Sequence, residues 1–265
     1  MRIACNLFPG GRPGTLTLSY DDGTVHDRRL VEILDRHGIR GAFHLNSGLL
    51  DTEGYLRSAE VADLFRNHEV SAHTVTHPHL PDLPRDRVAS EILEDRRALE
   101  GLVGYPVRGL SYPFGGHDAR VRAMLPSLGI EYARTVERRD GFETPSDFLA
   151  WGPTCHHGDG LLERAEAFLA RERGWHRHVL YVWGHSYEFA QDGTWDLVEA
   201  FCRRVGGRED VWYATNIEIV DYTRAVASLR FTLSGEAVHN PSAAAVWISV
   251  DGKALQIGAG QRVRL

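Results

Sequence analysis

Strand-like and helix-like segments alternate along this chain from Thr15 to about Tyr222. The first strand-like segment is "TLTLSY" (15–20), in which larger apolar residues alternate with threonine and serine. The amphipathic stretch "HDRRLVEILDRHG" (26–38) follows it and ends at a glycine. Repeated strand–helix units form parallel sheets joined by right-handed crossovers. About seven such units in roughly 210 residues favour a small α/β barrel over a doubly wound sheet.

The same two patterns predict the later elements. Strands are predicted at 39–46, 69–73, 107–115, 131–136, 178–185 and 211–215. Helices are predicted at 58–68, with Ser58 as N-cap, and at 85–104, 118–129, 161–173, 194–207 and 216–229. The stretch from 137 to 158 is irregular. No G-x-G-x-x-G follows the first strand, which argues against a dinucleotide-binding fold.

The pattern changes after Leu229. Residues 229–265 contain short strand-like runs, an Asn-Pro turn and the hairpin signal "VDGK", without a helical period. A segment this short cannot form an independent core. We therefore predict two parts, an α/β barrel over residues 1–228 and a small all-β appendage over 229–265 that packs on it.

Composition limits the partners of the protein. Hydrophobic residues make up 43% of the chain and charged residues 25%, as is ordinary for a globular protein. The net charge of -6 gives no reason to expect nucleic acid or an anionic membrane surface, and no stretch has the apolar length of a membrane span. The N-terminus lacks the apolar core of a signal peptide, and three widely spaced cysteines suggest no disulfide framework. We therefore expect a cytoplasmic protein, and the oligomeric state stays open.

Acidic and histidine side chains stand where several predicted strands end. "LTLSYDDGT" runs a strand into Asp21 and Asp22, which precede a turn-permitting glycine. His73 ends the strand "EVSAH", and His185 ends the strand "HVLYVWGH". In parallel α/β folds, catalytic groups gather at this carboxyl edge of the sheet. Two adjacent acids can then divide the work, one binding a metal and one handling protons.

His73 and His77 have the four-residue spacing of a helical zinc motif, but Pro78 disfavours a helix there. A fully extended strand would separate the two histidines by about 13 Å, which is too far for one ion. Chelation therefore requires a bend, which hydrogen bonds from the hydroxyls of Thr74 and Thr76 to the backbone can support. Alone, such a pair is more often two surface histidines. Combined with one aspartate and open positions for water, it forms a catalytic rather than a structural zinc site.

Four motifs occur in a fixed order along the chain: "SYDDG", "HTVTHP", "SYPFGG" and "VLYVWGHSYEF". In this order they resemble the polysaccharide deacetylase family (NodB-homology domain, carbohydrate esterase family 4), from roughly Thr15 to Tyr222. The resemblance implies a distorted (β/α)7 barrel. It also implies metal-dependent hydrolysis of N-acetyl or O-acetyl groups from an amino sugar, an oligosaccharide or a polysaccharide, with release of acetate.

The resemblance assigns a role to residues in each motif. A zinc ion, or another divalent metal such as cobalt, would be held by Asp22, His73 and His77. Asp21 would be the catalytic base and His185 the acid that protonates the departing amine. The backbone N–H near Phe114 would stabilise the oxyanion, and Tyr112 would lie beside it at the substrate. The partner would be an acetylated carbohydrate.

Residues that follow or precede the acid histidine are further candidates. Trp183 and Tyr187 stand where a sugar could stack, although strand alternation also explains Trp183 as a core residue. Glu188 either orients His185 or is an ordinary surface acid.

The chain departs from the family pattern in two motifs. The third motif often carries an arginine, two residues before its proline, that contacts the base. That position is Ser111 here, and Arg108 lies further back. The charge that tunes Asp21 must then come from the metal or from another group.

The fourth family motif, an aspartate and a tryptophan that support the acid histidine, has Asp159 and Trp151 as candidates. In the same stretch, His156 and His157 are either substrate contacts or part of a solvated loop. Asn216 either faces the mouth of the barrel or is the N-cap of the last helix.

Other functions are compatible with parts of this pattern. The same barrel could hydrolyse a small linear or cyclic amide. A catalytically inactive carbohydrate-binding homologue should have lost Asp21 or His185, and both are present. A serine hydrolase built on Ser186 is disfavoured because the G-x-S-x-G turn is absent.

Overall fold

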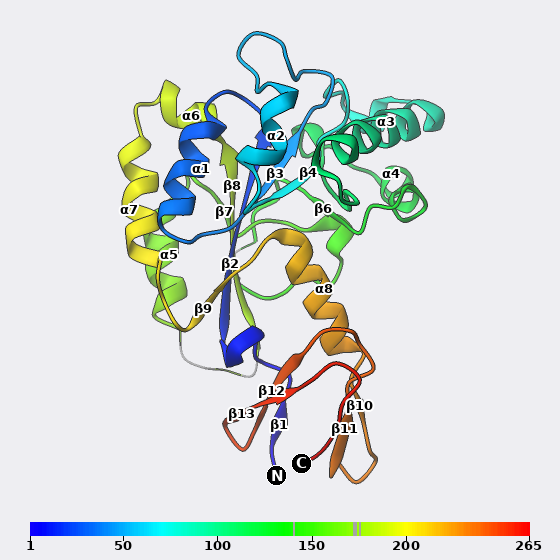
Figure 1. Ribbon diagram of the computed structural model, residues 1–265, viewed down its shortest axis with the longest axis vertical. Coiled ribbons are helices and arrows are strands. Elements are labelled where there is room, and N and C mark those ends of the chain that lie inside the picture. Colours follow the sequence, from blue (N-terminus) through cyan, green and yellow to red (C-terminus); the bar gives the residue numbers. More distant parts are fainter. Residues whose placement is uncertain (140, 172–173, 175) are drawn as a thin grey trace.

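A long strand, β2 (Gly14–Asp22), runs up the middle of the molecule, of which the computed structural model describes residues 1–139, 141–171, 174 and 176–265 (Figure 1). All but the last of its residues are buried, because the barrel interior covers one face and helices cover the other. The strand predicted at 15–20 is therefore present, and it extends to include both adjacent acids.

Parallel strands flank β2 in the order β6-β5-β4-β3-β2-β8-β7, and β9 also pairs with β2. The bounds are β3 Ala42–Leu45, β4 Glu69–Ala72, β5 Gly109–Ser111, β6 Tyr132–Arg134, β7 Cys155–His156, β8 His178–His185 and β9 Val211–Tyr213. Every pairing in this sheet is parallel. The predicted parallel α/β architecture is confirmed.

The segment from Trp151 to His157 joins the two ends of the curled sheet. The N–H of Trp151 donates to the carbonyl of Ala133 in β6 at 2.9 Å, and the N–H of His157 donates to the carbonyl of Trp183 in β8 at 2.9 Å. β7 lies within this segment. The sheet therefore forms the distorted barrel expected from the family resemblance, with β9 added at the foot of β2.

Helices cover the outside of the sheet: α1 Asp27–Arg36, α2 Val61–Leu64, α3 Arg85–Val103, α4 Ala119–Met124, α5 Leu161–Leu169, α6 Ser186–Gln191, α7 Trp195–Val205 and α8 Asn216–Ala227. In α1, Leu30, Ile33 and Leu34 recur on one face and are buried against the sheet. α3 ends before Gly104, whose φ of 74° is left-handed and easy only for glycine. None of the described helices is long and apolar enough to span a membrane.

The helix predicted at 58–68 is wrong in extent. The chain forms a 3-10 turn, Ser58–Glu60, and then the single turn of α2, so Ser58 lies inside the first turn and is not an N-cap. Val61 and Phe65 supply the apolar spacing that suggested a longer helix, and both are buried. The chain must leave the helix soon after them, since β4 begins at Glu69.

Two differences concern the segments around β8. The helix predicted at 161–173 ends at Leu169, and positions 172–173 lie outside the described residues. α6 begins directly after His185 and was not predicted. A helix of six residues is too short to show a 3.6-residue period.

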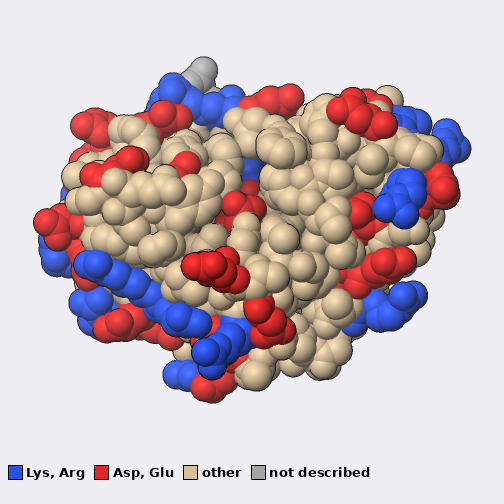
Figure 2. Space-filling model, turned by 90° about the horizontal axis from the view of Figure 1, so that it is seen from above, with Lys and Arg blue, Asp and Glu red and all other residues tan. Residues whose placement is uncertain are grey.

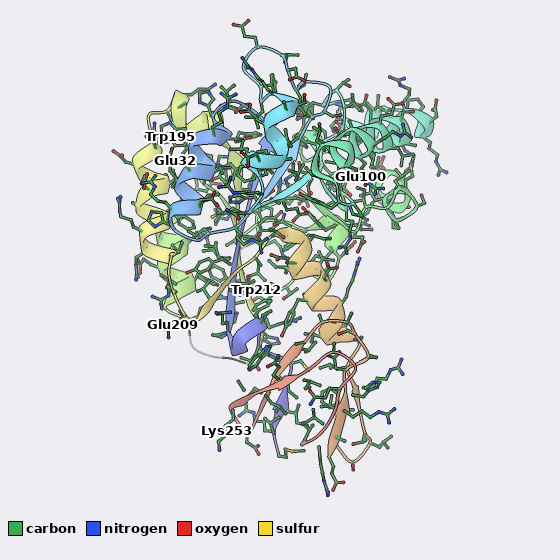
Figure 3. The ribbon with its side chains drawn as sticks, viewed as in Figure 1. Glu32, Glu100, Trp195, Glu209, Trp212 and Lys253 are labelled. Carbon is green, nitrogen blue, oxygen red and sulfur yellow. The ribbon has the colours of Figure 1, made fainter. Side chains whose placement is uncertain are left out.

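The residues after α8 form two small antiparallel sheets, as predicted for the appendage. One sheet contains β10 Arg230–Phe231, β11 Ala237–His239 and β14 Arg262–Arg264, and the other joins β12 Val246–Val250 and β13 Lys253–Ile257 to β1 Ile3–Ala4. The N-terminal strand thus pairs with the appendage. Val246 and Ile248 share one buried cluster with Ile219 and Val220 of α8. Figure 3 shows Lys253 in this lower part of the molecule and Trp212 nearer the barrel.

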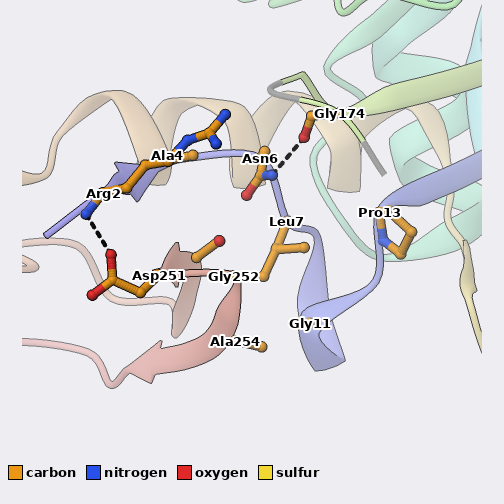
Figure 4. A pocket seen from close by; sticks show the side chains of 11 residues that line it. Arg2, Ala4, Asn6, Leu7, Gly11, Pro13, Gly174, Asp251, Gly252 and Ala254 are labelled. Carbon is orange, nitrogen blue, oxygen red and sulfur yellow. Dashed lines mark hydrogen bonds between the residues drawn. The ribbon is translucent and has the colours of Figure 1, made fainter. Parts of the chain in front are cut away.

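A cavity of about 520 Å³ lies where the N-terminal segment meets the appendage (Figure 4). Arg2 N–H donates to Asp251 Oδ1 at 2.7 Å, and Asn6 Nδ2 donates to the carbonyl of Gly174 at 2.7 Å. These bonds connect the N-terminal segment to the appendage and to the barrel. None of the predicted site residues lines this cavity.

Gly109 in β5 tests this packing, because a Cβ added there would lie 2.2 Å from Cζ of Tyr132. The Tyr132 ring cannot move away freely, since its hydroxyl donates to Glu69 at 2.7 Å. Gly109→Ala should therefore lower the free energy of unfolding in urea by about 1–3 kcal/mol. The control Gly101→Ala, in α3 with nothing within 4 Å, should raise it by about 0.5–1 kcal/mol. A stabilising Gly109→Ala would contradict this packing.

Candidate active site

A cavity of about 530 Å³ opens where the parallel strands end. Most of the predicted site residues line it: Asp21, Asp22, His73, His77, Tyr112, Phe114, Trp183, His185 and Tyr187. Figure 2 views the molecule from this end: most charged side chains lie around the periphery, and a few acidic ones stand in and near the hollow at the middle of the face. The strand ends named in the prediction therefore share one cavity.

Both carboxylates at the end of β2 reach this cavity, although neighbours in a strand normally point to opposite faces. Asp21 is in register with His44 of β3 and with His185 of β8, so it points into the barrel. Asp22 has a φ of 82° and Gly23 a φ of 72°. This left-handed turn ends the alternation and directs Asp22 to the same side as Asp21.

Asp22, His73 and His77 converge on one point. His73 Nε2 lies 3.5 Å from Asp22 Oδ1, and His77 Nε2 lies 3.7 Å from the same oxygen. One ligand atom from each residue lies within 4.8 Å of the others. Ligand atoms around a tetrahedral zinc lie roughly 3.4 Å apart when each bond is about 2.1 Å. The three side chains are therefore a possible metal-binding group.

The ring of His73 is fixed in the tautomer that a metal ligand needs. Its Nδ1 lies 2.8 Å from the carbonyl oxygen of Ser111 and 2.5 Å from the Ser111 hydroxyl. A carbonyl oxygen can only accept, so Nδ1 carries the proton and Nε2 presents a lone pair. Burial lowers the pKa of His73 and outweighs the neighbouring Asp21 and Asp22, which keeps the ring neutral. Ser111, at the family's arginine position, thus holds His73 in this tautomer.

The loop 73–77 is bent by left-handed backbone conformations. Thr74 has a φ of 70° and His77 a φ of 57°. The Thr74 hydroxyl accepts a hydrogen bond from the N–H of His77 at 3.1 Å, as predicted. Phe114, across the cavity, shares this conformation with a φ of 58°. Strained residues of this kind gather at functional sites, where surrounding contacts must hold them.

Side chains from α3 and from the end of β3 hold the backbone of this loop. Asp95 accepts the N–H of His73 at 2.9 Å. Glu91 accepts the N–H and the hydroxyl of Thr76, at 3.0 and 2.8 Å, so this hydroxyl bonds a carboxylate and not the backbone as predicted. Asn46 Nδ2 donates to the carbonyl of His73 at 2.5 Å. The bend between the two histidines is thus fixed from outside the loop.

Arg134 of β6 forms a buried ion pair with Asp21. Burial alone would raise the pKa of Asp21, but Arg134 and the imidazoles of His73 and His44 hold this pKa well below its ordinary value. Arg134 is the group that tunes Asp21 and that could not be identified from the sequence. Its only sequence signal was a lone arginine inside the predicted strand "EYARTV".

One oxygen of Asp21 stays available to a proton. Oδ2 faces Arg134, whereas Oδ1 is buried and accepts no hydrogen bond from any side chain or backbone group of the described residues. His44 Nδ1 lies 3.6 Å from Oδ1, and burial lowers the pKa of His44 to about 3, so this ring is neutral. Asp21 is therefore an ionised carboxylate whose Oδ1 has no hydrogen-bond donor among the described residues.

His185 faces Asp22 across the cavity, with Nε2 at 4.0 Å from Asp22 Oδ2. Its Nδ1 lies 3.3 Å from Glu188 Oε1. The ring of Tyr187 stacks on the imidazole at 5.1 Å, and the ring of Trp183 meets it edge-on at 5.7 Å. Burial opposes the charged form, but Glu188 and the nearby aspartates raise the pKa of His185 above its ordinary value.

Aromatic residues of the "YPFG" segment form the opposite wall. Phe114 is 68% exposed at the rim, and its ring centroid lies 4.5 Å from that of His77. Tyr112 is buried, and its hydroxyl donates to the carbonyl of Leu149 at 2.7 Å. Tyr112 therefore contributes ring surface to the wall, while its hydroxyl is used inside the protein.

Three candidate residues lie away from the cavity. Trp151 is 2% exposed and packs on Tyr181 in the core, with ring centroids 4.5 Å apart. Asp159 lies on an exposed loop. Both interpretations of Asn216 are wrong, because its side chain is buried against Tyr181 and the N-cap of α8 is Thr215. The carboxylate beside Nδ1 of His185 belongs to Glu188, and neither Trp151 nor Asp159 lines this cavity.

A second group of histidines lies around Glu188, next to His185. His156 Nε2 and His157 Nε2 lie 3.0 and 3.2 Å from Glu188 Oε2. His157 is 4% exposed, so a solvated loop is the wrong interpretation for it. These three residues are also spaced closely enough for a cation.

Residues 10–133 match the family model described as polysaccharide deacetylase. This confirms the family resemblance. The matched segment contains Asp21, Asp22 and both loop histidines, and it ends before Arg134 and His185. The chitooligosaccharide deacetylase of Rhizobium leguminosarum bv. phaseoli is 36% identical over 105 residues, which are 39% of this chain and 44% of the relative. The chain thus spans less than half of that deacetylase.

Two solved structures share the deacetylase fold over most of the chain. A protein from Mycobacterium smegmatis, assigned to the polysaccharide deacetylases, is 17% identical with a TM-score of 0.62 and covers 82% of this chain and 92% of its own. The Xyl-CE4 domain of a multidomain xylanase from the hindgut metagenome of Trinervitermes trinervoides is 15% identical with a TM-score of 0.56, covering 80% and 92%. At these identities the likeness concerns the fold.

Replacement of Asp95 tests whether its carboxylate supports the loop 73–77. In Asp95→Ala the buried N–H of His73 and the partly buried N–H of Ser47 lose their acceptor, at about 1–3 kcal/mol each when fully buried. The free energy of unfolding of the metal-free protein should fall by at least about 2 kcal/mol in chemical denaturation. Glu94→Ala, exposed on the same helix, should change it by less than about 0.5 kcal/mol. Equal effects of the two substitutions would show that Asp95 does not support this loop.

Proposed function

We propose that this protein hydrolyses N-acetyl or O-acetyl groups of an amino sugar, an oligosaccharide or a polysaccharide with the help of a divalent cation. The observation that carries the proposal is the convergence of Asp22, His73 and His77 beside the ionised Asp21, with His185 on the facing wall. The Rhizobium relative is named a chitooligosaccharide deacetylase, which supports an acetylated carbohydrate as the substrate class.

The three ligands suit zinc or another divalent ion such as cobalt. Two imidazole nitrogens and one carboxylate oxygen leave open coordination positions, as catalytic sites require. The tautomer of His73 supports this assignment, since its lone pair faces Asp22. When bound, the cation would act as a Lewis acid toward the acetyl carbonyl and the attacking water.

Asp21 would act as the base. The water oxygen bonds to the acetyl carbon, and the proton that the water loses moves to the Asp21 carboxylate, whose Oδ1 accepts no other hydrogen bond within the described chain. Arg134 keeps this carboxylate ionised and fixes its orientation. The backbone N–H near Phe114 would donate to the developing oxyanion, a contribution that is large when the donor is preorganised.

His185 would act as the acid. Its Nε2 faces the cavity, and its Nδ1 faces Glu188 at 3.3 Å. A proton passes from Nε2 to the departing nitrogen, or to oxygen in an ester, as the bond to the acetyl carbon breaks. The products are acetate and the free amine or hydroxyl of the sugar.

The rim of the cavity favours a neutral sugar over a small amide. Phe114 and Val136 are 68% and 38% exposed there, and most charged side chains of the surrounding face lie around its periphery in Figure 2. Exposed aromatic surface suits the apolar face of a sugar ring. A small amide would leave this surface uncovered.

The test is acetate release from N-acetylated chito-oligosaccharides, O-acetylated xylan and small amides by the zinc-loaded protein. Release from a carbohydrate is expected, and a chelator should abolish it until zinc is restored. Asp21→Asn and His185→Ala should each lower kcat/KM at least about 10²-fold while the metal content stays unchanged. Asp159→Asn, on an exposed loop, is the control and should match the unmodified protein.

Three results would contradict parts of this proposal. Full activity of Asp21→Asn or of His185→Ala would remove the role assigned to that residue. Hydrolysis of amides alone would move the assignment to the small-amide alternative. Carbohydrate binding without acetate release from any substrate would identify an inactive homologue.

A further inference from the structure

The carboxylate of Glu188 is contacted from two elements. Its Oε2 accepts the backbone N–H of His185 at 3.0 Å and lies 3.0 Å from His156 Nε2 and 3.2 Å from His157 Nε2. Its Oε1 lies 3.3 Å from Nδ1 of His185. Burial alone would raise the pKa of Glu188, but the contacts with His156 and His185 hold this pKa well below its ordinary value. Glu188 is therefore ionised, and one of its oxygens is surrounded by nitrogen atoms.

The tautomer of His156 is set by its other ring nitrogen. Nδ1 of His156 accepts the backbone N–H of Gly158 at 3.1 Å. A nitrogen that accepts a hydrogen bond carries no proton, so the proton of the neutral ring sits on Nε2. His156 therefore donates to Glu188 and offers no lone pair there. A metal ligand would need the opposite tautomer.

The two ring nitrogens of His157 have different surroundings. Nδ1 is buried, has no hydrogen-bond partner among the described residues, and lies where a Cβ on Gly184 would come within 2.0 Å. The ring stacks on Phe189 with centroids 4.1 Å apart. Burial lowers the pKa of His157 to about 3, so the ring is neutral. Its single proton is stabilised on Nε2, beside the Glu188 carboxylate.

We propose that His156 and His157 are positioning residues whose two Nε2–H groups hold Glu188 against His185. With Oε2 occupied by these donors and by the backbone N–H of His185, Oε1 is the oxygen left to face Nδ1 of His185. The ring of His185 is then oriented with Nε2 toward the cavity. This inference rests on the proposed function, in which His185 donates the proton.

The alternative occupant of this cluster is a second cation, since the same three residues are spaced for one. The tautomer of His156 favours donors over ligands. Long-range proton–nitrogen NMR of the metal-free protein, followed by titration with zinc, distinguishes the two. Both rings are expected as Nε2–H tautomers, and one equivalent of zinc should bind without displacing these protons.

Kinetics test the positioning role with a substrate that the unmodified protein deacetylates. His156→Phe keeps a flat ring without a donor and should lower kcat about 10-fold or more, with KM nearly unchanged. His156→Gln places an amide N–H near the position of Nε2 and should recover most of kcat. Combining His156→Phe with Glu188→Gln should be no worse than Glu188→Gln alone. His239→Phe, in the distant appendage, is the control and should leave kcat unchanged.

Each contrary result has a distinct meaning. A second equivalent of zinc that disappears in His156→Phe would overturn the proposal in favour of metal ligands. Equal losses in His156→Phe and His156→Gln would reduce His156 to a packing role and also overturn it. If the unmodified protein deacetylates nothing, the proposed function fails, whereas the NMR tautomers still decide whether the two histidines donate to Glu188.

Discussion

The candidate site depends on how β2 pairs and ends. Its parallel register places Asp21 opposite His44 on one neighbour and opposite His185 on the other. A shift of one residue would point Asp21 away from the barrel interior. The left-handed turn at Asp22 and Gly23 then brings a second carboxylate to the same cavity. Both acids thus face one cavity because the alternation of side-chain direction along the strand ends between them.

The charged side chains around this strand end come from elements that are far apart in the sequence. Arg134 reaches Asp21 across 113 positions of sequence, and the pair is almost entirely buried. An unpaired carboxylate at that depth would favour its neutral form, so the ionised state of Asp21 depends on β6. Similarly, α3 supplies two carboxylates that hold the bend between His73 and His77. The rigid barrel therefore supports a backbone that is locally strained.

The sequence predicted those features that depend only on residues close together in the chain. Strand alternation located β2, and the reach of an extended chain required the bend between His73 and His77. Arg134 could not be assigned, because nothing in its own strand indicates which residue it meets after the sheet curls. His157 is buried because of where the segment that joins the two ends of the sheet lies. The sequence of that segment has no strand or helix periodicity, so its burial could not be predicted. The helix predicted at 58–68 was too long because the prediction used only the spacing of apolar residues. That spacing does not indicate where β4 begins.

The central claim is that Asp22, His73 and His77 bind one cation next to Asp21. It is tested most directly by anomalous X-ray scattering at the zinc absorption edge from crystals of the zinc-loaded protein. The account predicts a single strong peak within bonding distance of these three side chains, with none beside His156, His157 and Glu188. A peak only at the second group, or no ordered zinc in the strand-end cavity, would contradict it.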